Sequence, residues 1–266
     1  MPCAGQQPER IQNRLSQNRL FGSDFLITQN RIETRGIIIF YILKKYSCLQ
    51  SLRLLKHTLI MENPSHEQVK ELLGEVVLPF YDINRDMLIP TQPRGERRFE
   101  NDAEHSWSLA VIACSLAPHI DPDLDLGLVS QFAIVHDLVE VYADDTSIWA
   151  DKTAIDNKEA NEAEALERIK NKFPHFPWLV DTLARYEQQD TPEALYVRSI
   201  DKYVGHTIRF LDEGEAYRTL LHVTKEMFVA VTEAQKHKVA GHAGAAAYYN
   251  YIIDDWMAHP EFFYQD

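Results

Sequence analysis

The sequence contains few cysteines and no long apolar run, and both absences limit what the protein can be. Its three cysteines, Cys3, Cys48 and Cys114, form neither an even framework nor a Cys-x-x-Cys pair. This excludes a disulfide scaffold or a zinc knuckle and favours a reducing compartment. The longest apolar run, near Ile37 to Leu43, is far shorter than the roughly 20 residues that a membrane span needs. We therefore expect a cytoplasmic protein without a membrane partner.

Positive charge is also scarce. The chain has 27 Lys and Arg against 40 Asp and Glu, a net charge of -13. A surface this acidic repels phosphate backbones, so we expect no nucleic-acid polymer as a partner. Any phosphate that the protein handles should be small and held at a site that contains cations. The 266 residues, 45% of them hydrophobic, are enough for a packed core.

The first 60 residues differ from the rest of the chain. They carry nine Lys or Arg and three acidic residues, a net charge of +6, whereas residues 61–266 carry -19. Arg-rich, acid-poor composition is typical of organellar targeting segments. A poorly ordered accessory arm and an upstream extension of a reading frame that truly starts at Met61 are the alternatives. We therefore expect a basic leader over 1–60 and the functional domain over 61–266.

From Met61 onward the apolar residues recur at helical spacing, and no stretch alternates convincingly with a period of two. Ser65 and Thr191 are placed to cap helices, and Pro192 suits a first helical position. We expect helices after Ser65, over 103–117, from the DPDLD stretch to about 142, and over about 156–173, 177–188, 192–211 and GHAGAAAYYNYIIDDWM. The 103–117 helix is apolar almost all round and should be buried. The prediction is one all-α domain, a compact multi-helix bundle, with Trp107, Tyr142 and Trp149 as core aromatics.

One stretch, AIVHDLVEV, places ionisable residues inside an otherwise apolar helix. On a helical wheel with His136 at 0°, Asp137 lies at about 100° and Glu140 at about 40°, so the three share one narrow strip. One and two turns back, that strip continues with Ala133 and Val129 rather than with charged residues. Glu140 alone would suit a helix surface, but its place between His136 and Asp137 predicts a pocket.

Asp201 lies in the middle of an apolar stripe. Its neighbours at spacings of three and four are apolar, and they are Ala194, Val197, Val204 and Ile208. A buried carboxylate must be neutralised, paired or bound to a metal. Lys202 is adjacent in sequence but starts about 100° away around the helix, so we expect it to be a poor partner.

His105 begins the apolar helix in the stretch ENDAEHSWSLA, and alone it would be a structural or exposed histidine. Together with His136, Asp137 and Asp201 it offers two imidazoles and two carboxylates on three helices. Nitrogen and oxygen donors of this kind suit a divalent ion such as Mn, Co, Fe, Ni or Zn with open positions for water and substrate. The lack of cysteine ligands favours a catalytic over a structural metal.

These stretches resemble one family. ENDAEHSWSLA, VHDLVEVYADDTS and YVRSIDKYVGH, in this order and spacing, are similar to the HD-domain metal-dependent phosphohydrolases, and within them to the YfbR-like 5'-deoxynucleotidases. The resemblance implies that His105, His136, Asp137 and Asp201 bind the metal. It implies acidic roles beside the ligands for Glu140 and Asp145. It further implies a homodimer that acts on small nucleotides.

The sequence departs from the family pattern at two places. Asp144 precedes Asp145 where the family usually has glycine. An Arg-Trp pair that helps to hold the nucleotide in the family has no tryptophan in PRGERRFEN, which leaves Arg94, Arg97 and Arg98 as candidates for the phosphate. Asp144 is a further candidate for contact with the substrate.

Only His175 lies between the HD pair and Asp201, whereas binuclear members of the family have two histidines there. We therefore expect one divalent metal ion. The reaction expected is hydrolysis of 5'-(deoxy)nucleoside monophosphates, in which Glu140 handles the water and Asp145 or Asp144 assists the leaving oxygen. The alternatives are a phosphodiesterase, a nucleoside triphosphate hydrolase, and a non-catalytic module in which the metal stabilises the fold.

Overall fold

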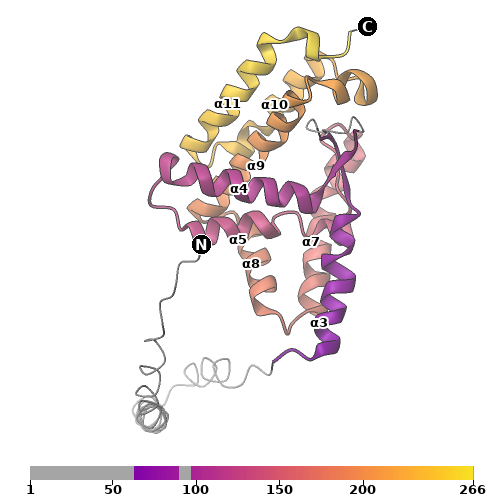
Figure 1. Ribbon diagram of the computed structural model, residues 1–266, viewed down its shortest axis with the longest axis vertical. Helices are drawn as coiled ribbons and strands as arrows, with labels where there is room; N and C mark the ends of the chain where they lie inside the picture. The colour runs from indigo at the N-terminus through magenta and orange to yellow at the C-terminus, as the bar shows by residue number, and fades with distance from the viewer. Residues whose placement is uncertain (1–62, 90–96, 266) are drawn as a thin grey trace, which may run out of the picture. The chain divides into compact units, whose positions relative to one another are not determined.

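The computed structural model describes residues 63–89 and 97–265. The predicted leader over 1–60 and Arg94 lie outside these residues. Residues Asn63–Asp266 form a compact unit of their own, and the prediction of an all-α fold is confirmed (Figure 1). Its elements are α3 His66–Leu72, η1 Leu73–Val77, η2 Pro79–Tyr81, β1 Asn84–Leu88, β2 Phe99–Asn101, α4 Asp102–Ile120, α5 Leu126–Val135, α6 Glu140–Ala143, α7 Lys152–Lys172, α8 Pro177–Gln188, α9 Pro192–Leu211, η3 Tyr217–Leu221, α10 Lys225–Val239, α11 Ala243–Ala258 and η4 Pro260–Phe262.

Side-chain caps fix where the principal helices begin. Ser65 forms the expected cap on α3, as a capping box with Gln68. Thr191 caps α9 by accepting a hydrogen bond from the Ala194 amide at 3.2 Å. Asn101 caps α4, a second capping box in which its side chain accepts from the Glu104 amide at 3.0 Å. Because α4 starts at this cap, His105 is held in the first turns of the helix.

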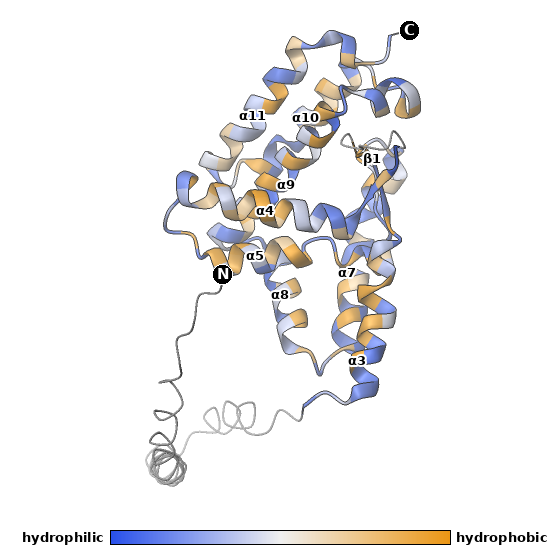
Figure 2. Ribbon diagram, in the orientation of Figure 1, coloured by the Kyte–Doolittle hydropathy of each residue, from blue (hydrophilic) through white to orange (hydrophobic). Residues whose placement is uncertain are grey.

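Three helices, α4, α5 and α9, pack together at the centre of the domain (Figure 1). Hydrophobic residues occur along all three helices (Figure 2), and their buried side chains form one apolar core. Leu109 from α4, Phe132 from α5 and Val197 from α9 are each fully buried in this core. Burial of side chains of this size stabilises the fold by roughly 1.5–3 kcal/mol each. The same packing brings together the helix segments that carry the predicted ligands.

A short antiparallel hairpin, β1 with β2, precedes α4 and was not predicted. It pairs Asn84 with Asn101 and Leu88 with Phe99, with an irregularity in register between them. Two strands of five and three residues show too little alternation to be recognised. The hairpin matters because it places Arg85 beside the start of α4.

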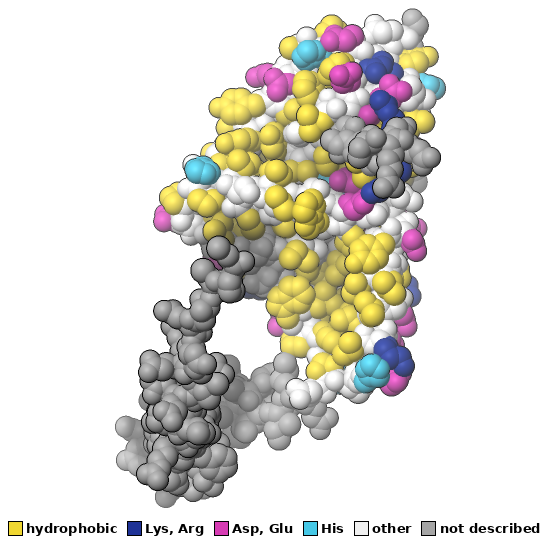
Figure 3. Space-filling view, in the orientation of Figure 1, with side chains coloured by type: hydrophobic (Ala, Val, Ile, Leu, Met, Phe, Trp, Pro, Cys, Tyr) yellow, Lys and Arg dark blue, Asp and Glu magenta, His cyan; other side chains and the backbone are white. Residues whose placement is uncertain are grey.

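Two expectations for the apolar helices were wrong. The helix over 103–117 is not buried all round, because α4 has an exposed face on which Trp107 is 69% and Val111 is 45% exposed. Hydrophobic atoms are visible over α4 in the space-filling view (Figure 3). Trp107 is therefore not a core aromatic, whereas Trp149 packs edge-on against the buried Tyr217. A run of apolar residues does not reveal which of them face a neighbour.

Among the described residues, Leu126–Ala143 is the one stretch whose length and hydropathy would suit a membrane span. Its side chains Phe132, Ala133 and Val135 are packed in the domain core. The regular α-helix also ends at Val135, so the stretch is not one continuous helix. Packing within the domain accounts for its hydropathy.

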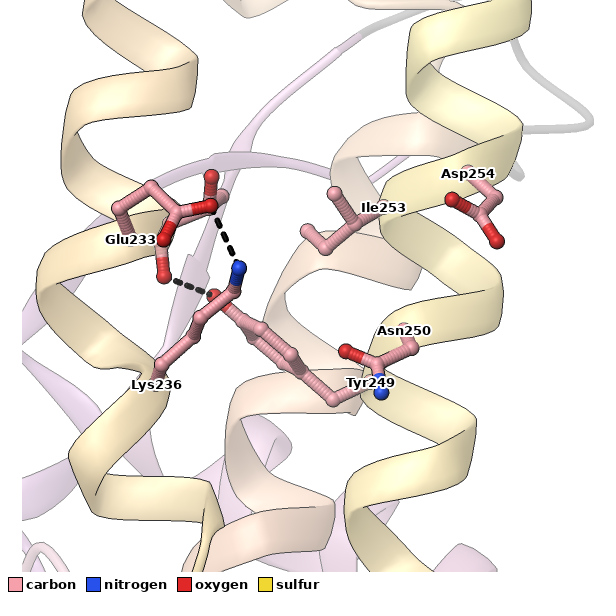
Figure 4. Close-up of a pocket in the computed structure, with 7 residues that line it drawn as sticks. Glu233, Lys236, Tyr249, Asn250, Ile253 and Asp254 are labelled. Carbon is pink, nitrogen blue, oxygen red and sulfur yellow. Dashed lines mark hydrogen bonds and ion pairs between the residues drawn. The ribbon is translucent and has the colours of Figure 1, made fainter.

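Helices α10 and α11 leave a groove between them (Figure 4). Lys236 and Glu233 form an ion pair of 2.5 Å across one side of it, and the Tyr249 hydroxyl donates to the Thr232 carbonyl at 3.1 Å. Helix α10 was not predicted, because its charged residues obscure the apolar spacing. The groove contains none of the residues that the sequence analysis selected.

Gly214 lies in the turn after α9, where φ is +69° and an added Cβ would collide with the Phe262 backbone. We expect Gly214→Ala to lower the free energy of unfolding by at least about 1–2 kcal/mol, because both the backbone conformation and the contact oppose a side chain. Gly74→Ala is the matched control, because its Cβ would meet nothing within 4 Å. Urea denaturation of the two variants measures the difference, and equal stabilities would contradict the prediction.

Candidate metal centre

His105 lies in α4 and is fully buried. Its Nδ1 lies 3.2 Å from Glu100 Oε2, and its Nε2 lies 3.0 Å from Asp201 Oδ1. Burial favours the neutral ring, but the hydrogen bonds to Asp201 and Glu100 outweigh it and raise the pKa of His105 to about 9. A carboxylate on Nδ1 is the arrangement that directs Nε2 of a metal-binding histidine toward its ion.

His136 lies at a break between α5 and α6, and the continuous helix expected up to about residue 142 was wrong. From Val135 to Tyr142, backbone bonds join residues three apart, such as Glu140 N to Asp137 O at 2.9 Å. The His136 Nδ1 donates to the Ala133 carbonyl at 3.0 Å, and because a carbonyl only accepts, Nδ1 carries the proton. The lone pair of Nε2 is therefore free for a ligand.

The four predicted ligands converge. The rings of His105 and His136 lie 5.5 Å apart, and His136 Nε2 lies 2.8 Å from Asp137 Oδ2 and 3.8 Å from Asp201 Oδ1. His105, His136 and Asp201 can each offer one donor atom with all three atoms within 4.8 Å of one another. The residues predicted from the sequence therefore lie close together in the fold.

Asp201 is buried in α9 as predicted, but the expectation that Lys202 is a poor partner was wrong. The Lys202 Nζ lies 2.6 Å from Asp201 Oδ2. A lysine stem is long and flexible enough to bring its ammonium group back to a neighbour whose Cβ points elsewhere. Burial opposes the charge on Asp201, but Lys202 and the hydrogen bond from His105 hold the pKa of this carboxyl well below its usual range.

The donor atoms fit a divalent cation. His136 Nε2 is buried and makes no hydrogen bond within the described chain, although a buried imidazole nitrogen without a partner is unfavourable. It faces two carboxylates, and the resulting nitrogen and oxygen set suits borderline divalent metals. His105, His136 and Asp201 can therefore hold a metal ion, and Asp137 lies beside them against His136.

Arg85, which the sequence analysis missed, lies next to this cluster. Its Nη1 lies 2.6 Å from Asp137 Oδ2 and 2.9 Å from Asp102 Oδ1, and 4.0 Å from Glu140 Oε2. Asp102 is fully buried, and burial raises its pKa to about 6 even though Arg85 opposes the shift. Burial would likewise raise the pKa of Asp137, but the charges of His136 and Arg85 hold it well below its usual range.

Glu140 is 2% exposed and pairs with Lys158 of α7 at 3.0 Å, while Lys158 also contacts Glu162 at 2.7 Å. Burial and then the charge of Asp137 raise the pKa of Glu140, against the effect of Lys158. The other oxygen, Oε2, is buried without a hydrogen-bond partner. Glu140 thus lies beside the cluster with one oxygen fixed and the other unpaired.

The turn after α6 separates the two adjacent aspartates. Asp144 adopts φ 60° and ψ 152°, a region that glycine favours and that costs other residues about 1–3 kcal/mol. Asp145, one residue further, is close enough for its charge to raise the pKa of both Arg85 and Glu140. The effect of its charge on these two groups is consistent with Asp145, rather than Asp144, as the acidic residue beside the site.

Of the arginines expected from PRGERR, the two that the structure describes, Arg97 and Arg98, pair with carboxylates other than the predicted ligands. Arg97 lies 3.4 Å from both Asp212 and Glu215. Arg98 pairs with Glu104 at 2.5 Å and is about half exposed. Arg85 precedes this loop in the short strand β1, and no motif in the sequence distinguishes it from the other arginines.

This geometry defines a helical domain with a buried His/Asp cluster that fits a divalent metal, between α4, the α5–α6 break and α9. The family described as HD domain matches residues 91–243, more than half of the chain. The chain belongs to the HD-domain family. The matched region contains His105, His136, Asp137 and Asp201, whereas Arg85 lies outside it.

A solved structure supports the fold. The crystal structure of a predicted metal-dependent phosphohydrolase from Magnetospirillum magnetotacticum MS-1 is similar, with a TM-score of 0.58 and 24% sequence identity. The similarity covers 77% of this chain and 100% of that chain. A comparison with curated proteins gave no match.

We expect Asp201→Ala to remove the bound metal and to lower the free energy of unfolding by about 3–5 kcal/mol, because His105 and Lys202 lose their buried partner. Asp201→Asn, which keeps the side-chain volume, should lose the metal with a smaller loss of stability. Elemental analysis of the purified variants and urea denaturation measure the two effects. Full metal content in Asp201→Ala would refute the assignment of this ligand.

Glu100 orients His105, so we expect Glu100→Ala to weaken metal affinity roughly 10–100-fold. Glu104→Gln is the matched control, because Glu104 belongs to the same helix start but pairs with the exposed Arg98. Competition with a chromogenic chelator measures both affinities. Equal affinities in the two variants would show that Glu100 does not act through the ligand.

Proposed function

We propose that the protein is a metal-dependent phosphohydrolase that releases phosphate from small nucleotides, with 5'-(deoxy)nucleoside monophosphates as the preferred class. Membership of the HD-domain family supports this proposal, as does the similarity to the Magnetospirillum protein, a predicted metal-dependent phosphohydrolase. The observation that carries it is the pair of buried imidazoles, whose Nε2 atoms face Asp201 and Asp137 beside the partly buried Arg85. The nucleotide preference rests on the resemblance to the YfbR-like enzymes.

In this proposal His105, His136, Asp137 and Asp201 hold one divalent ion. A bound ion of this kind lowers the pKa of a bound water and polarises a phosphoryl oxygen. Glu100 and the Ala133 carbonyl orient the two imidazoles through their Nδ1 atoms. The two imidazole ligands thus keep a fixed orientation before a substrate arrives.

Arg85 takes the role that the sequence analysis gave to the PRGERR loop. Its Nη1 is held by Asp102 and Asp137, while its Nε is buried without a partner in the described chain. A guanidinium in this position can neutralise a phosphate dianion, which a protein with a net charge of -13 requires. Arg85 therefore takes the place of Arg97 and Arg98 as the proposed phosphate contact, and the prediction for Arg94 lies outside the described residues.

Glu140 and Asp145 supply the acid-base chemistry. Lys158 fixes Glu140 Oε1, so the unpaired Oε2 can accept a hydrogen bond from the attacking water and then its proton. Asp145 donates a proton to the leaving oxygen of the substrate.

The homodimer stays a prediction, and the exposed side chains of α4 are one apolar surface available to it.

The reaction is tested with the full chain, stripped of metal and reloaded with Mn²⁺ or Co²⁺. We expect phosphate release from nucleoside monophosphates and from neither triphosphates nor cyclic nucleotides.

We expect Glu140→Gln to keep its metal and to lower kcat by about 100-fold or more, because it lacks the proton acceptor.

Each alternative function has its own outcome. Hydrolysis of triphosphates alone, or of cyclic nucleotides alone, would replace the nucleotidase by a different phosphohydrolase. Metal binding without release of phosphate from any of these substrates would favour a non-catalytic module.

A further inference from the structure

A second set of candidate ligands lies beside the first. Asp102, Asp137 and Glu140 each offer a carboxylate oxygen, and the three atoms lie within 4.8 Å of one another. Asp102 is 0% and Glu140 is 2% exposed. The set contains oxygen donors alone, which suit a hard divalent cation such as Mg²⁺ or Mn²⁺.

Two oxygens of this set indicate that it is built around a cation. Asp102 Oδ2 and Glu140 Oε2 are buried and have no hydrogen-bond partner in the described chain. An unpaired carboxylate oxygen in the interior is unfavourable, because it has lost water without gaining a donor or an ion. Lys158 compensates the opposite oxygen of Glu140 and leaves Oε2 unpaired.

Arg85 provides the positive charge of this set. One nitrogen, Nη1, lies 2.6 Å from Asp137, 2.9 Å from Asp102 and 4.0 Å from Glu140. A guanidinium keeps its proton under all ordinary conditions, so its charge is permanent. Together with Lys158 it supplies two positive charges among three carboxylates, and neither side chain donates a hydrogen bond to Asp102 Oδ2 or Glu140 Oε2.

We infer that the Arg85 guanidinium takes the place of a second divalent cation and so limits the protein to one metal ion. Asp137 is the shared residue, since the same Oδ2 lies against both His136 Nε2 and Arg85 Nη1. In two-metal phosphoesterases the second ion holds the phosphoryl group. Here a fixed organic cation occupies that position. The inference rests on the proposed function for the presence of the first ion.

The test counts metal ions in the full chain. Metal-free protein is incubated with excess Mn²⁺, passed through a desalting column, and measured by elemental analysis and native mass spectrometry. Wild type should hold one ion per chain and Arg85→Ala should hold two. Adding Asp102→Ala to Arg85→Ala should return the count to one, because the second set then lacks a ligand.

Arg98→Ala is the matched control, since it also removes an arginine paired with a carboxylate, but at an exposed position. It should retain one ion. Folded Arg85→Ala that still holds one ion would overturn the inference, as would a second ion in Arg98→Ala.

Arg85→Ala is expected to unfold more easily without metal, because buried carboxylates lose their counter-charge. Mn²⁺ should therefore raise its Tm more than it raises the Tm of wild type. A variant that cannot fold even with millimolar Mn²⁺ would also overturn the inference, because the ion would then fail to substitute for the guanidinium.

The count also separates this inference from the proposed function. Wild type without any bound ion would refute the proposed function. A gain of one ion in Arg85→Ala, from none to one, would still support the inference in that case.

Discussion

The structure depends on compensating several carboxylates that are buried close together. Isolated charges in a protein interior are so unfavourable that each must be paired. Removing one partner leaves the other charge buried without compensation for its lost hydration. The cationic partners come from different parts of the fold, Arg85 from β1, Lys158 from α7 and Lys202 from α9. These ion pairs therefore join the hairpin to α4 and α7 to α6, as well as shaping the site.

Local signals were enough to predict much of the fold. Helix caps such as Ser65 and Thr191 are determined by the few residues around them, and the structure confirms both. The burial of Asp201 followed from the spacing of its apolar neighbours, because in a regular helix that spacing defines one face. The order of the three motifs was informative because the fold packs these segments together, in α4, at the α5–α6 break and in α9.

Features that depend on tertiary contacts could not be predicted. Arg85 resembles any other arginine until the hairpin places it against Asp102 and Asp137. The helical wheel around His136 assumed a regular α-helix, whereas the backbone changes to bonds between residues three apart at that point. Lys202 was misjudged because Cβ direction says little about where a long side chain ends.

The contact between His105 and Asp201 joins residues 96 positions apart. Closing a loop of this length removes a large part of the chain's conformational freedom. The contact therefore exists only while α4 and α9 are docked against each other. Any ligand that bridges these two side chains acts as a reversible cross-link between α4 and α9. Its binding should therefore stabilise the whole bundle against unfolding rather than order one helix alone.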